Sequence, residues 1–109
     1  MNEPEDTGQD EATSIQIIAG DEDLKGRYAN LMSVSHTGEE FVLDFFSVTP
    51  SSSGAARGTL VSRVVTSPPH FKRIVAALAD NLHKYEAQFG EIEEPRGHFP
   101  DPEDIGFIH

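Results

Sequence analysis

One stretch of the chain, residues 67–90 with the sequence SPPHFKRIVAALADNLHKYEAQFG, constrains the fold more than any other. Its large apolar residues recur at steps of three and four, so they share one stripe along a helix. They are Phe71, Ile74, Val75, Leu78, Leu82, Tyr85 and Phe89. Ser67 is a suitable N-cap, Pro68 fits the first turn and Gly90 is a suitable C-cap. The pattern predicts one long amphipathic helix whose stripe packs against another element.

Three segments before this helix are typical of β-strands, namely residues 27–36, 41–48 and 59–66. The polar group at residues 37–40 predicts a tight turn, and the Pro/Ser/Gly-rich residues 49–58 predict a loop. A weaker alternation at residues 14–20 predicts a short edge strand. The predicted fold class is therefore α+β, an antiparallel sheet of three to four strands followed by one long amphipathic helix packed on one face.

Acidic residues concentrate at the two ends of the chain. Residues 1–23 carry a net charge of −8, residues 90–109 carry −5, and residues 24–89 carry +2, which together give the net charge of −11. We therefore predict a disordered acidic N-terminal tail over residues 1–13, a single domain over 14–90, and an extended acidic C-terminal tail over 91–109. Four apolar residues of that second tail could bind a partner or its own domain, and disorder is the alternative; they are Phe99, Ile105, Phe107 and Ile108.

The two faces of the predicted sheet differ in what can cover them. If Val48 lies opposite Thr59, one face, here called the Leu43 face, carries Phe41, Leu43, Phe45, Leu60 and Val64 with Tyr28, Met32 and Val34 of the first strand. The helix stripe is expected to cover it. The other face, the Asp44 face, has no second helix to cover it, so we predict a homodimer or higher homo-oligomer through this face. The expected interface residues are Leu31, Val42, Asp44, Phe46, Val48, Val61, Arg63 and Val65.

The same register places Asp44 opposite Arg63. Opposite charges attract across a strand pair, so a structural ion pair is the favoured interpretation. A catalytic carboxylate is the alternative, and a neighbouring arginine would make it a weak general base.

Other candidate chemistry is sparse. The five histidines, His36, His70, His83, His98 and His109, show no metal-binding spacing, so no metal and no cofactor are expected. Ser33, Ser35 and His36 are close in sequence, but alternation would place the serines and the histidine on opposite faces of a strand. The loop SSSGAARG lacks the ending that a nucleotide-binding loop needs.

These observations favour a non-enzymatic, oligomeric protein-interaction module, an adaptor or chaperone-like binder with an unknown protein partner. The alternative is a small enzyme or ligand-binding domain with a site at a subunit interface near Asp44 and Arg63. The chain shows no signal peptide and no apolar run long enough to span a membrane, so we expect a cytoplasmic protein without membrane contact. The acidic ends argue against binding to nucleic acid.

Two long segments, YANLMSVSHTGEEFVLDFFSVTP and VSRVVTSPPHFKRIVAALADNLHKYEAQFGEI, resemble a small prokaryotic family, domain-of-unknown-function family 3467. The resemblance covers the chain from Leu24 to Ile92 and leaves both acidic ends outside. It implies a compact module and carries no activity over to any residue.

Overall fold

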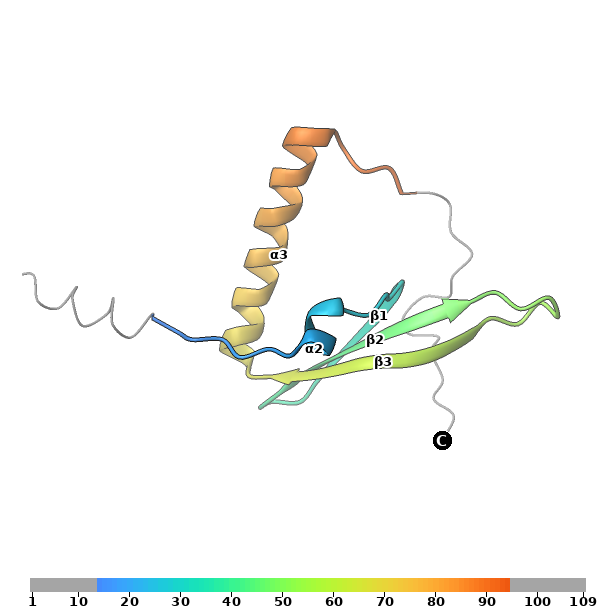
Figure 1. Ribbon diagram of the computed structural model, residues 1–109, viewed down its shortest axis with the longest axis horizontal. Coiled ribbons are helices and arrows are strands. Elements are labelled where there is room, and N and C mark those ends of the chain that lie inside the picture. The colour runs from blue at the N-terminus through green and yellow to red at the C-terminus, as the bar shows by residue number, and fades with distance from the viewer. Residues whose placement is uncertain (1–13, 95–109) are drawn as a thin grey trace, which may run out of the picture.

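The computed structural model describes residues 14–94, which form a three-stranded sheet followed by a long helix (Figure 1). The strands are β1 (Leu31–His36), β2 (Phe41–Thr49) and β3 (Arg57–Thr66), and the helix is α3 (Pro68–Phe89). The sheet is antiparallel, with β2 between β1 and β3. The predicted α+β order is confirmed. The predicted N-terminal tail over residues 1–13 lies outside the described residues, and so does the predicted C-terminal tail over 91–109 from residue 95 onward; residues 91–94 form no helix or strand and are exposed.

The expected edge strand at residues 14–20 is wrong, because these residues form no strand and are exposed. A short helix that the pattern did not predict follows, α2 (Asp21–Lys25). Its first turn is acidic, which suits the positive end of a helix, and Asp23 accepts a hydrogen bond from the backbone N–H of Gly20 at 3.0 Å. The alternation of apolar and polar residues at 14–20 covers too few positions to specify a strand, and the capping at Gly20 favours the short helix that follows.

The first strand begins at Leu31, four residues later than expected, and Asn30 explains the boundary. Its amide oxygen accepts a hydrogen bond from the Val48 N–H at 2.8 Å, and its amide nitrogen donates to the Val48 carbonyl at 3.1 Å. The side chain thus occupies the pairing position that the backbone of a longer strand would use.

The predicted register between β2 and β3 holds from Phe41 to Phe45 and then shifts by one residue. Phe45 pairs with Ser62 and Phe46 with Leu60, so Val61 is the extra residue of a β-bulge. The expected position of Leu60 on the Leu43 face is therefore wrong, because Leu60 lies opposite Phe46 on the Asp44 face.

Helix α3 begins and ends where its capping residues predict. The Ser67 hydroxyl accepts a hydrogen bond from the His70 N–H at 3.3 Å, and Gly90 follows the last turn with φ 98° and ψ 161°, a backbone region that only glycine adopts easily.

Contact between helix and sheet is confined to the start of α3. Phe71 stacks on Phe41, with ring centroids 3.9 Å apart and planes within 1° of parallel, while the rest of α3 rises away from the sheet (Figure 1). Phe41 belongs to the Leu43 face, so the predicted face is the one contacted, but the expected packing does not extend beyond this first turn. The short connection accounts for the difference, since Ser67 alone separates β3 from α3, fewer residues than the about two to six that usually link a strand to a helix packed on its sheet.

Candidate interaction surface

The charged pair in the middle of the sheet forms as the register predicts. Arg63 donates two hydrogen bonds to the Asp44 carboxylate, from Nε to Oδ1 at 2.6 Å and from Nη2 to Oδ2 at 2.8 Å. The Asp44 side chain is buried, whereas the Arg63 side chain is half exposed. The hydrogen bond to Asp44, and then its negative charge, raise the pKa of Arg63 above the usual value for arginine. This two-point geometry is that of a structural ion pair.

The residues of the predicted interface on the Asp44 face differ in how far the single chain already buries them. Asp44 and Phe46 are each 5% exposed and Val48 is 6% exposed, so these three offer almost no surface to a partner. Leu31, Val42 and Val61 are half buried, and Arg63 and Val65 are exposed. Of the predicted interface residues, only Arg63 and Val65, both on β3, are exposed. The proposed tail contacts, Phe99, Ile105, Phe107 and Ile108, lie outside the described residues.

One helix face of α3 carries a row of exposed apolar side chains. Val75, Leu78, Leu82, Tyr85 and Phe89 are each between 48% and 66% exposed. The sequence pattern identified these residues as one stripe but assigned them to the core. The one-residue connection at Ser67 was the available signal that the stripe would remain uncovered.

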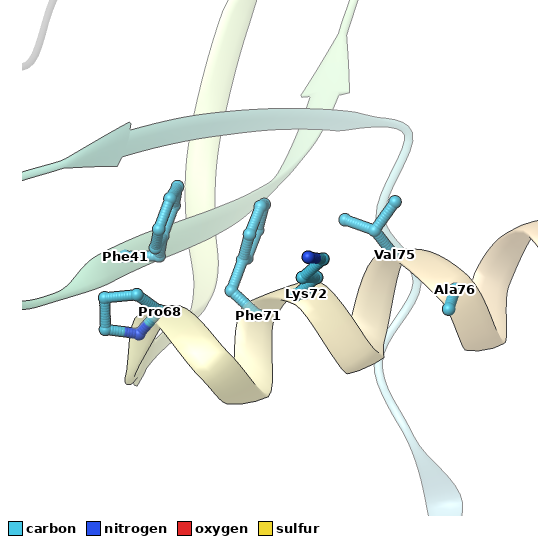
Figure 2. Close-up of a pocket in the computed structure, with 6 residues that line it drawn as sticks. All are labelled: Phe41, Pro68, Phe71, Lys72, Val75 and Ala76. Atoms are coloured by element: carbon cyan, nitrogen blue, oxygen red, sulfur yellow. The ribbon is translucent and has the colours of Figure 1, made fainter.

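An open apolar hollow lies at the base of α3, where the helix meets the sheet. Figure 2 shows the parallel rings of Phe41 and Phe71 side by side, with Val75 one turn further along the same side of the helix. The hollow measures about 560 Å³ and is lined by Phe41, Pro68, Phe71, Lys72, Val75 and Ala76. Its lining contains no carboxylate, hydroxyl or imidazole, so it suits an apolar side chain better than a reacting substrate.

Two other sets of polar residues do not assemble into a site. Ser33 and Ser35 share the Asp44 face through their pairing with Asp44 and Val42, whereas His36 pairs with Phe41 and lies 5.3 Å from its ring, so the predicted separation is confirmed. Within residues 14–94, no cluster of three His, Cys, Asp or Glu side chains could hold a metal ion.

The polar side of α3 carries one intrahelical ion pair. Lys84 forms an ion pair with Asp80 at 3.1 Å, one helical turn before it, as the i,i+4 spacing predicts. In the described residues, no helix is both long enough and apolar enough to cross a bilayer.

Comparison with known proteins finds one family. The model of the family described as "Protein of unknown function (DUF3467)" matches residues 1–94. The match includes the acidic N-terminal segment, so the expectation that both acidic ends lie outside the family was wrong for the first of them. No curated protein and no solved structure matches the chain.

Proposed function

This chain belongs to the DUF3467 family, and we propose that it is a non-enzymatic, oligomeric protein-interaction module of the cytoplasm, an adaptor or chaperone-like binder. The observation that carries the proposal is the uncovered apolar stripe of α3. Contiguous apolar surface of this kind usually marks a protein-protein contact.

The energetics of the stripe support association. Burying a Leu or Phe side chain completely contributes about 1.5–3 kcal/mol, and the five exposed stripe residues have about half of their surface left to bury. Covering the stripe would therefore contribute on the order of 5 kcal/mol per chain before the cost of association. The small core, limited to Leu43, Phe46 and Val48 in the described residues, gives a further reason to expect stabilisation by a partner.

No observation favours the alternative of a catalytic or ligand-binding site near Asp44 and Arg63. The Asp44 carboxylate is held by two hydrogen bonds from Arg63, and the apolar hollow is built from other residues, around Phe41 and Phe71. A structural ion pair accounts for this arrangement.

The test is the mass of the full chain in solution. Light scattering at micromolar concentration should give at least twice the chain mass of 11.9 kDa. A mass equal to one chain across this range, with no hetero-partner recovered from native cells by cross-linking, would contradict the proposed function.

A further inference from the structure

The stripe on α3 has the spacing of a coiled-coil seam. Its residues Phe71, Val75, Leu78, Leu82, Tyr85 and Phe89 are separated by four, three, four, three and four residues. This alternation is the heptad a/d pattern, with Val75, Leu82 and Phe89 at a and Phe71, Leu78 and Tyr85 at d. A helix that only covers a sheet does not need so regular a repeat of 3.5 residues.

We propose that α3 pairs with α3 of a second copy of this chain to form an antiparallel, two-stranded coiled coil. The inference rests on the proposed function, because it names the occupant of the same uncovered stripe. The seam extends over about three heptads, which is near the lower limit for such a pattern. The pairing is symmetric, so each copy covers the stripe of the other.

Charges next to the seam select the antiparallel orientation. The e positions are Lys72, Ala79 and Glu86, with the small residue midway between the two charges. In an antiparallel pair the e positions face each other, so Lys72 of each copy lies against Glu86 of the other, and attraction occurs twice. In a parallel pair the e positions face g positions, and these are the uncharged Ile74, Asn81 and Gln88.

The antiparallel alignment also fills the hollow at the base of α3. It forms three kinds of apolar layer, Phe71 with Phe89 of the second copy, Val75 with its Tyr85, and Leu78 with its Leu82. The first layer brings the exposed Phe89 of one copy to the hollow beside Phe71 of the other (Figure 2). One contact thus covers the stripe and occupies the hollow, while the Asp80–Lys84 ion pair remains at outer positions facing water.

Charge reversal tests the register. Lys72→Glu and Glu86→Lys each place like charges against each other twice, so each variant alone should dimerise about tenfold more weakly than the unchanged chain. An equimolar mixture should recover the original affinity as a heterodimer, because both facing pairs are then attractive. Glu86 also accepts a hydrogen bond from the Ile92 N–H at 2.9 Å, so Glu86→Gln, which retains an acceptor, is the control for losing that bond. Failure of the mixture to recover the affinity would overturn the antiparallel register.

Cysteine trapping tests the same geometry without relying on charge, because the natural chain contains no cysteine. Lys72→Cys mixed with Glu86→Cys should cross-link efficiently with a short bis-maleimide. Neither variant alone should cross-link, because the same position in the two copies, 72 with 72 or 86 with 86, is about 21 Å apart along antiparallel helices. Absence of cross-linking in the mixture contradicts the proposed pairing.

A matched pair of aspartate variants separates this inference from the proposed function. Leu78→Asp should weaken self-association at least about a hundredfold, whereas Ala77→Asp, one residue away at an outer position, should leave it unchanged. Both variants should retain the helical circular dichroism of the full chain, because Leu78 is exposed in the single chain. An oligomer that is insensitive to Leu78→Asp would overturn the coiled coil and leave the proposed function standing. A chain that is monomeric before any substitution would overturn the coiled coil, and the proposed function would also fail if native cells yielded no hetero-partner.

Discussion

Asp44 and Arg63 show how one cross-strand pair can stabilise a small sheet. Asp44 lies on the central strand and is buried, and the half-exposed Arg63 reaches it from β3. The free-energy cost of desolvation is therefore mainly that of the Asp44 carboxylate, which accepts two hydrogen bonds from Arg63 in compensation. The hydrogen bond and the negative charge of Asp44 raise the pKa of Arg63, so the pair favours the charged guanidinium further.

Removing the two partners should have unequal effects. Arg63→Ala leaves a buried carboxylate without its donors, so it should destabilise the chain more than Asp44→Asn, for which we expect about 1–3 kcal/mol. Urea melts of the two variants and of the double variant measure this. The double variant should lose less than the sum of the two, and strictly additive losses would show that the pair contributes no coupling.

Helix α3 owes its limits to residues at its ends rather than to its packing. Ser67 caps the first turn, Pro68 and Pro69 follow with a fixed backbone, and Gly90 ends the helix with φ 98°. These local signals do not depend on the sheet. They explain why a helix with little tertiary contact has such well-marked boundaries.

Gly90→Ala should destabilise the chain by about 1–3 kcal/mol, because alanine is strained at this backbone conformation. No atom lies within 4 Å of the added Cβ, so the effect would come from the backbone alone. Gly38→Ala is the matched control, since Gly38 also has open space and lacks a positive φ. Thermal melts that show equal stability for the two variants would argue against backbone strain at Gly90.

The whole molecule combines a strongly acidic composition with an uncovered apolar helix face. Residues 24–89 carry only +2, and the flanking segments carry −13 in total. A net negative charge of this size repels polyanions, whereas the exposed stripe offers apolar contacts.

The intact chain should therefore not bind nucleic acid at physiological salt. Fluorescence anisotropy with single- and double-stranded probes should show no binding at micromolar protein. The matched variant replaces the five acids of residues 1–13, namely Glu3, Glu5, Asp6, Asp10 and Glu11, with their amides. Any binding that it gains should be weak and should fall steeply with salt. Micromolar binding by the unchanged chain would contradict this account of its partners.

Local pattern was sufficient to predict much of this protein. The ends of α3 follow from capping at Ser67 and Gly90, and the strand order and the Asp44–Arg63 pair follow from alternation over short loops. These features depend on neighbours along the chain or across one strand pair, so periodicity and turn chemistry are enough to find them.

Tertiary structure decided what is covered. The β-bulge at Val61 moved Leu60 to the Asp44 face, and Phe46 and Val48 became core residues rather than open surface. The stripe of α3, which its pattern assigns to a core, stayed exposed because Ser67 alone connects β3 to the helix and directs it away from the sheet. An amphipathic pattern shows that one face of a helix is apolar. Which element covers that face depends on the direction in which the backbone leaves the preceding strand.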